Sequence, residues 1–240
     1  YDSYPAEYEA VFESNTSQKA FEEDVLLAGF GSAPTKSEGS AISYDDAGQQ
    51  WTARYQHETV ALAFSITEEA EEDGQYGSIA SRYTKALARS MASTKEIKAA
   101  NVLNNATSAN IGDGTTLLST SHPTQNGNQS NTLATAADLS ETSLEAILIQ
   151  IADMKDERGL RIAAQGTQLV IPTAYTFVAE RLLESQLRTG TADNDINAIK
   201  SGGYLPGGYH VMRRLTDADA FFVLTDVPDG LKMFQRSPMK

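Results

Sequence analysis

Few residues in this sequence have the types and spacing that catalysis requires. Its three histidines are His57, His122 and His210, and cysteine is absent. No two histidines stand at the H-x-x-H or H-E-x-x-H spacing that brings zinc ligands together. The lack of cysteine removes thiolate ligands, thiolate nucleophiles and disulfides. A Ser–His–Asp triad built from distant positions stays open, because such triads are defined by geometry rather than by order along the chain.

One acidic stretch resembles the start of a calcium-binding loop. Asp193, Asp195 and Asn197 have the alternating spacing of its first three ligands. However, Ala198 stands where the loop needs glycine, and Tyr204 stands where it needs a bidentate glutamate. We therefore predict no calcium site here.

Nucleotide-binding motifs are also incomplete. Gly29 and Gly31 begin a G-x-G-x-x-G pattern, but its sixth position is Pro34. The phosphate-loop Gly-Lys-Ser/Thr and the G-x-S-x-G nucleophile turn do not occur in the sequence. The sequence predicts no cofactor, no metal site and no catalytic residue.

The most informative pattern is an extended segment in the first third of the chain. We expect a β-hairpin with strands at 40–44 and 50–66 and a turn at 45–48. In the second strand, Trp51, Ala53, Tyr55 and His57 share one side, whereas apolar residues from Val60 to Ile66 take the other side. This change is explained by a bulge or twist in an ordinary sheet. Alternatively, the base packs on its own subunit and the aromatic side meets a partner.

The other elements predict an α+β protein. Periodic apolar residues indicate one long helix over about 74–106 and a second over about 138–158. We read 107–137 as loops, with a short strand at 116–119. A buried strand at 167–171 ends at a proline that opens a third helix, 173–188. Strands at 209–215, 220–225 and 231–235 follow.

The composition is acidic, with a formal net charge of −13. Such a charge opposes tight binding to nucleic acid or anionic lipid, because these need clustered lysine and arginine. It fits ordinary solubility, and it also fits a surface that faces packed DNA without adhering to it. No apolar run is long enough for a transmembrane helix.

Several blocks stand out, in order along the chain: Tyr-Pro-Ala-Glu-Tyr-Glu at 4–9, Lys-Ala-Phe-Glu-Glu-Asp at 19–24, Trp-Thr-Ala-Arg-Tyr at 51–55, Arg-Tyr-Thr-Lys-Ala-Leu-Ala-Arg-Ser-Met at 82–91, Gly-Thr-Ala-Asp-Asn-Asp-Ile-Asn at 190–197 and Leu-Pro-Gly-Gly at 205–208. These blocks resemble the major capsid proteins of tailed bacteriophages, of the Hong Kong 97-type fold family. The resemblance covers nearly the whole chain.

This resemblance implies a division of the chain into structural parts. These are an N-terminal arm (1–28), an extended β-hairpin loop that reaches over a neighbouring subunit (29–66), a peripheral domain with the long spine helix (67–109), a mainly axial domain (110–225) and a return to the peripheral domain (226–240). Family members normally begin before and continue beyond segments like these, so we expect an incomplete peripheral sheet at the C-terminal end.

The implied function is structural: hexamers and pentamers of this chain form the icosahedral head that encloses double-stranded phage DNA. The implied partners are copies of itself, a scaffolding protein, a maturation protease, a portal, a decoration protein and packaged DNA held non-specifically, with no membrane. The implied location is the virion capsid, assembled in the host bacterial cytoplasm. Two alternatives are an encapsulin-type nanocompartment shell and an acidic soluble hydrolase.

Subunit interfaces favour aromatic and arginine side chains. On the loop we expect contacts from Trp51, Arg54, Tyr55 and His57, with the aromatic side turned away from its own subunit. Further interface candidates are Tyr4, Tyr8, Phe12, Asp193 and Asp195.

Overall fold

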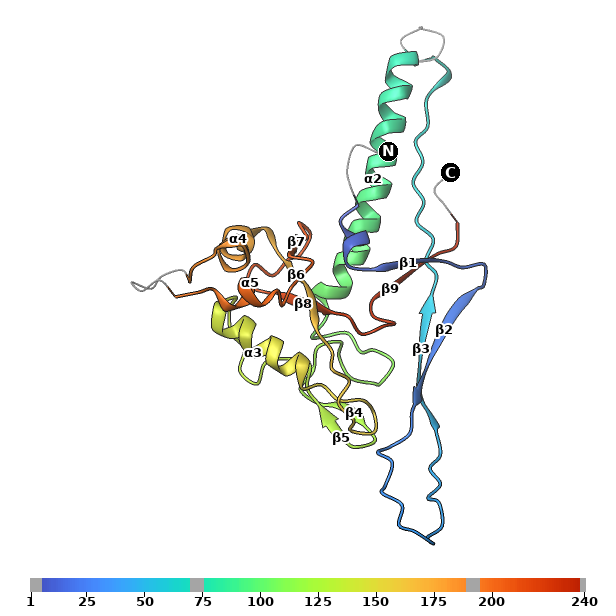
Figure 1. Cartoon of the computed structure of the whole chain (residues 1–240). Coiled ribbons are helices and arrows are strands. Elements are labelled where there is room, and N and C mark those ends of the chain that lie inside the picture. The colour runs from blue at the N-terminus through green and yellow to red at the C-terminus, as the bar shows by residue number, and fades with distance from the viewer. Residues whose placement is uncertain (1–5, 70–75, 189–194, 238–240) are drawn as a thin grey trace.

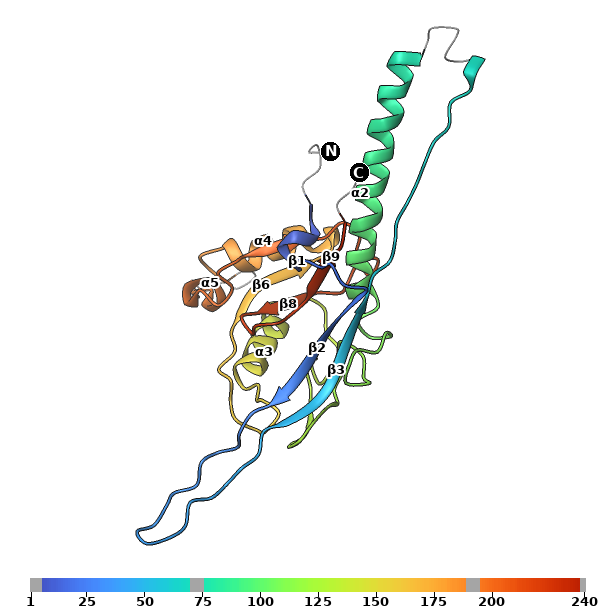
Figure 2. The same ribbon diagram turned by 90° about the vertical axis from the view of Figure 1, so that its right-hand side faces the viewer.

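A computed structural model describes residues 6–69, 76–188 and 195–237. A compact body carries two projections that leave it in opposite directions (Figures 1 and 2). The elements are η1 (Tyr8–Ala10), β1 (Glu13–Thr16), β2 (Phe21–Ala28), β3 (Gly48–Gln56), α2 (Tyr76–Asn104), β4 (His122–Thr124), β5 (Gly127–Gln129), α3 (Glu141–Ala152), β6 (Gly166–Ile171), η2 (Thr173–Tyr175), α4 (Thr176–Glu184), α5 (Ala198–Gly202), β7 (Tyr209–Val211), β8 (Phe222–Thr225) and β9 (Lys232–Gln235). The mixed helix and strand content agrees with the α+β prediction.

The predicted long helix is present as α2, whose 29 residues span about 44 Å. Among the helix side chains whose burial is described, those that enter the core lie in its C-terminal third, and they include Ala99, Ala100 and Leu103. At the C-terminal end of the helix, the Asn104 side chain donates to Arg214 O and accepts from Thr216 N. The N-terminal half extends beyond the body, beside the extended segment 57–67 (Figures 1 and 2).

Strand β6 is the centre of the body, in a three-stranded sheet of order β7-β6-β8. Its side chains alternate between two core clusters, as period two requires. Leu169 and Ile171 pack with α3 and α4, whereas Val170 joins α2 and the N-terminal segment. All three side chains are fully buried, so β6 joins the two halves of the core.

Several predicted boundaries change in the structure. The third helix ends at Glu184 rather than at 188, because Ser185 is extended and Asn197 Nδ2 donates to Leu182 O and Ser185 O. Helix α3 begins after Ser140, whose hydroxyl accepts from Ser143 N. The strands at 209–215 and 220–225 shorten to Tyr209–Val211 and Phe222–Thr225. Within the predicted loops of 107–137, β4 and β5 form a short hairpin instead of a strand at 116–119.

The N-terminal segment is part of the body. Tyr8, Val11 and Phe12 are buried against α2, and β1 pairs in parallel with β9. Glu96 on α2 accepts hydrogen bonds from Glu7 N and Tyr8 N, at 2.9 and 3.2 Å. Burial raises the pKa of this carboxyl despite these two bonds. Tyr8 and Phe12 are therefore core residues, and their expected interface role is wrong.

The ribbon differs from the predicted hairpin in its partner strand. Strand β3 pairs with β2 in antiparallel register, and residues 29–47 form a long loop between them. Residues 40–44 are not a strand, and β3 ends at Gln56 rather than at 66. Beyond Gln56 the chain leaves the ribbon and runs along α2, where Phe64 meets Tyr83 with ring centroids 5.8 Å apart. This departure explains why the apolar side changes after His57.

The position of Phe12 predicts a large effect on stability. Replacing this buried ring by alanine should lower the free energy of unfolding by about 3–5 kcal/mol, through lost burial and a cavity. Phe30→Ala is the matched control because Phe30 is 61% exposed, and its effect should stay within about 0.5 kcal/mol. Urea unfolding followed by circular dichroism measures both. Equal effects would show that the N-terminal segment is not part of the core.

Candidate subunit interface

The ribbon of β2 and β3 has an inner side toward the body and an outer side away from it. Exposure alternates along both strands. The inner side carries Trp51, Ala53, Tyr55 and His57, and the outer side carries Phe21, Glu23, Val25, Leu27, Thr52, Arg54 and Gln56. The aromatic side thus faces its own subunit, which contradicts the expectation that it is turned away.

Three contacts hold the inner side to the body. The Trp51 ring lies directly on Gly112, where a Cβ atom would stand only 2.5 Å from Trp51 Cε3. Tyr55 packs against Phe234 of β9, with ring centroids 5.0 Å apart. His57 Nε2 lies 3.3 Å from the hydroxyl of Ser17. Burial raises the pKa of the Tyr55 phenol, as expected for a ring held in the interior.

Lys232 joins the ribbon to the C-terminal strand. Its ammonium lies 2.6 Å from Asp229 Oδ1 and 2.9 Å from Asp24 Oδ2 on β2. The side chain is only 11% exposed. Hydrogen bonds to Asp229 and then to Asp24 raise the pKa of Lys232 well above its usual range. A nearly buried cation therefore fixes the base of the ribbon against β9.

The outer side and the adjoining loop expose an apolar strip, here called the ribbon strip. Its members are Phe21, Val25, Leu27, Phe30, Ile42 and Tyr44. Leu27 is 72% exposed and Tyr44 is 93% exposed. Arg54 crosses the strip's base, with its guanidinium 4.5 Å from the Phe21 ring centroid and its Nε 2.7 Å from Glu23 Oε1. Large exposed apolar side chains gathered on one element often mark protein–protein contact surfaces.

The loop 29–47 is attached at its base and free beyond it. Asp45 accepts from Gly31 N at 2.8 Å and from Arg158 Nη2 at 2.5 Å. These two bonds lower the pKa of Asp45. The residues between these attachment points are exposed, and the loop extends past the body (Figure 2). The ribbon is thus anchored along its inner side and at the base of the loop. The loop residues between Gly31 and Asp45 are exposed to solvent.

A second exposed element consists of residues 185–188 and 195–197, two segments that lie antiparallel to each other. Leu187 and Ile196 pair across it and are both exposed, and Arg188 N donates to Asp195 O. Asp195, an expected interface residue, is exposed here, whereas Asp193 and Tyr4 lie outside the described residues. Sequence reasoning missed Leu187 and Ile196, because two isolated apolar residues in a polar stretch have no period.

One Asp–His pair has the geometry that starts a catalytic triad. His122 Nδ1 lies 2.6 Å from Asp113 Oδ2, and Thr115 Oγ1 donates to the same carboxylate. Burial acts to raise the pKa of Asp113, but the bonds from His122 and Thr115 outweigh it and lower the pKa. His122 Nε2 is buried and has no hydrogen-bond partner in the described part of the chain, so no serine hydroxyl is activated there. Within the same residues, no cluster of three or more His, Asp or Glu side chains suits a metal ion.

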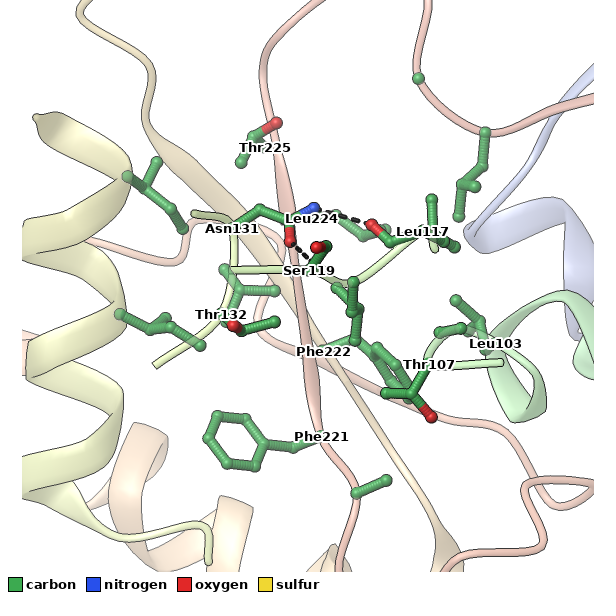
Figure 3. Close-up of a pocket in the computed structure, with 18 of the residues that line it drawn as sticks. Leu103, Thr107, Leu117, Ser119, Asn131, Thr132, Phe221, Phe222, Leu224 and Thr225 are labelled. Atoms are coloured by element: carbon green, nitrogen blue, oxygen red, sulfur yellow. Dashed lines mark hydrogen bonds between the residues drawn. The ribbon is translucent and has the colours of Figure 1, made fainter. Parts of the chain in front are cut away.

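A cavity of about 1170 Å³ lies between α3, β8 and the C-terminal end of α2 (Figure 3). Leu103, Phe222 and Leu224 contribute apolar side chains to its wall. The side chain of Asn131 is part of the lining of this cavity. Its Oδ1 accepts a hydrogen bond from Ser119 N at 2.9 Å, and its Nδ2 donates to Leu117 O at 2.8 Å. These amide bonds hold the 117–131 loops together, so the Asn131 side chain has a structural role there.

Comparison with known proteins identifies the family. The model of the family described as phage capsid protein matches residues 50–238. The chain belongs to the phage capsid protein family. This confirms the resemblance seen in the sequence, and neither the encapsulin-type shell nor the hydrolase is favoured. A search of curated proteins finds no match.

Solved capsid structures share the fold. The decorated capsid of bacteriophage JBD30, with minor capsid protein trimers, matches with a TM-score of 0.67 at 14% identity, over 89% of this chain and 92% of that chain. A second JBD30 capsid structure matches with a TM-score of 0.65 at 14% identity, over 87% of this chain and 90% of that chain. The JBD30 procapsid matches with a TM-score of 0.53 at 15% identity, over 88% of this chain and 92% of that chain.

This protein is a structural component of the phage capsid shell, and it resides in the virion capsid. Family and fold imply a structural rather than an enzymatic role. No helix in the described residues is both long and apolar enough to cross a membrane.

The contact between Trp51 and Gly112 predicts that Gly112→Ala destabilises the subunit. The added methyl group must displace the indole ring or the loop, which should cost about 1–3 kcal/mol of unfolding free energy. Gly29→Ala is the matched control, since nothing lies within 4 Å of its Cβ position. Trp51 fluorescence reports the unfolding directly because this is the only tryptophan. Unchanged stability in Gly112→Ala would contradict the inner-side packing.

Proposed function

We propose that this protein assembles as hexamers and pentamers into an icosahedral head around double-stranded phage DNA, and that the ribbon strip binds an adjacent copy. The strip is the observation that supports the contact. Its side chains are apolar and exposed. Repeated around closed rings, such contacts add up to a stable shell even where each one is modest.

The expected loop residues take two different roles in this proposal. Trp51, Tyr55 and His57 position the ribbon, because their contacts lie within the subunit. Arg54 contacts the neighbouring copy, because it is exposed beside the ribbon strip. An extended ribbon held rigidly along one side loses little conformational freedom when its other side binds.

The remaining parts follow the family's division. Residues 67–109 and 226–240 form the peripheral domain, supported by the pairing of β9 with β1 and the packing of Met233 near α2. Residues 110–225 form the axial domain, in which Leu187, Asp195 and Ile196 contact neighbours around the symmetry axes. The described residues of the arm comprise a buried segment with η1, strand β1 and strand β2.

Other partners are proposed from the family and from charge. A scaffolding protein, a maturation protease and a portal act during assembly, and a decoration protein binds the finished shell. The net charge of −13 lets packaged DNA lie against the shell without specific binding. Metal or cofactor has no role in this proposal.

Assembly of the expressed protein tests the function directly. Size-exclusion chromatography and negative-stain microscopy should show closed particles. A protein that stays monomeric at high concentration would contradict it.

The double variant Leu27→Ser, Tyr44→Ser tests the ribbon strip. Both side chains are exposed, so the subunit should keep its urea midpoint while particle yield falls at least about tenfold through loss of apolar contact. Val227→Ser, which removes an exposed apolar residue outside the ribbon, is the control. Wild-type yield from the double variant would remove the strip from the interface.

A further inference from the structure

We infer that the cavity beside β8 binds an extended segment of a different protein, which adds to the sheet as a strand next to β8. The segment carries a continuous apolar run flanked by lysine or arginine. The site lies in a different part of the subunit from the ribbon strip, so the inference does not depend on the proposed contact between copies.

Strand β8 is an edge strand with one unpaired side. It follows β6 in the sheet order β7-β6-β8, and within the described residues β6 is the only strand that pairs with it. Every residue from Asp219 to Thr225 lines the cavity. Since successive side chains of a strand point to opposite faces, a cavity that touches all of them runs along the strand edge. Such an edge presents backbone N–H and C=O groups that can pair with another chain.

The cavity opens into both core clusters. Phe222 and Leu224 pack with α2 and the N-terminal segment, whereas Phe221 and Val223 pack with α3 and α4. Figure 3 shows Phe221 and Phe222 on opposite sides of β8. All four side chains are only partly buried. A strand beside β8 places its own side chains alternately into these two apolar halves, so every position of the run must be apolar.

The size of the cavity and its backbone groups favour a polypeptide over a small molecule. Protein interiors have few voids larger than a water molecule, whereas this cavity has a volume of about 1170 Å³. A small apolar ligand would cover the side chains but leave the free edge of β8 without hydrogen-bond partners. An added strand covers the side chains and also pairs with the backbone.

The rim of the cavity is acidic. Glu13, Asp217 and Asp219 line it and are exposed. Asp229 also lines it, and Lys232 pairs with that carboxylate. In the part of the chain that the structure describes, no lysine, arginine or histidine lines the cavity. Basic residues at the two ends of the bound segment therefore complement the rim.

A second copy of this chain does not have the required chemistry. Its ribbon strip is apolar, but residues 20–35 contain three acidic residues and no basic one. This segment would bring like charges to an acidic rim, which is unfavourable. The basic residues of α2 lie on a helix, which cannot add to a sheet as a strand. The occupant is therefore an extended segment of a different protein.

A labelled peptide tests the charge complementarity. Fluorescein-labelled Lys-Lys-Val-Ile-Val-Leu-Val-Val-Lys-Lys should bind the full chain, measured by fluorescence anisotropy. Asp217→Lys, Asp219→Lys should weaken this binding at least about tenfold, because the rim then repels the peptide. The same variant should bind the peptide with glutamate in place of each lysine more tightly than the wild type does. Absence of binding to the wild type would overturn the proposal.

The matched control is Glu68→Lys, Glu69→Lys. It makes the same change in charge at exposed carboxylates outside the cavity. Its affinity for the lysine peptide should stay within about threefold of the wild type, since charges distant from the site act weakly. Equal losses in the two variants would show that net charge, rather than the rim, attracts the peptide, and would overturn the site.

Backbone methylation tests the strand geometry. Successive residues of a strand direct their N–H groups to opposite edges, so only every second residue of the peptide pairs with β8. N-methylation of one alternate set of its apolar residues should weaken binding at least about tenfold, through lost hydrogen bonds, whereas methylation of the other set should change it less than about threefold. Equal effects of the two sets would overturn strand addition.

Assembled particles identify the class of occupant. The lysine peptide should bind particles and unassembled subunits alike. Binding to subunits alone would show that another copy fills the cavity in the shell, and would overturn the assignment to a different protein. Failure of the protein to form particles would contradict the shell function and leave peptide binding to the subunit standing.

Discussion

The inner side of the ribbon is the contact on which the arrangement of this subunit depends. Trp51 on Gly112, Tyr55 on Phe234 and Lys232 between two carboxylates fix the ribbon to the body along one side. A strand places successive side chains on opposite sides, so anchoring one side necessarily turns the other outward. The exposure of Phe21, Val25 and Leu27 is therefore a consequence of how the ribbon is held.

A second constraint is the double burial of β6. Its alternating side chains belong to both core clusters, so the sheet with α3 and α4 and the layer formed by α2 and the N-terminal segment cannot move independently. The rigid body that results supports two long projections. The core needs only apolar residues at alternating positions, and such a pattern tolerates wide sequence change. This tolerance is consistent with a shared fold at 14% identity to the JBD30 capsid chain.

The distribution of charge separates surfaces by role. Helix α2 carries five of the 19 basic residues and only one acidic residue, so it has a net positive charge in a chain whose net charge is −13. None of the 240 residues is a cysteine, so the contacts that they make between copies do not include disulfides. Non-covalent contacts that are individually weak allow subunits to correct errors during assembly, and closure of the rings then stabilises the product.

The sequence by itself determined the elements with strong local periodicity and, through several ordered blocks, the family. Helices α2 and α3 and strand β6 were predictable because their apolar spacing lies within a few residues, but α3 ends at Ala152 rather than at the predicted 158. The tertiary structure alone decided that β2 is the partner of β3, because strand pairing joins segments that are distant in the chain. It also decided which side of the ribbon faces the body, since period two defines two sides but not their orientation. Tyr8 and Phe12 became core residues for the same reason: the surfaces that bury them come from α2, about 90 residues away.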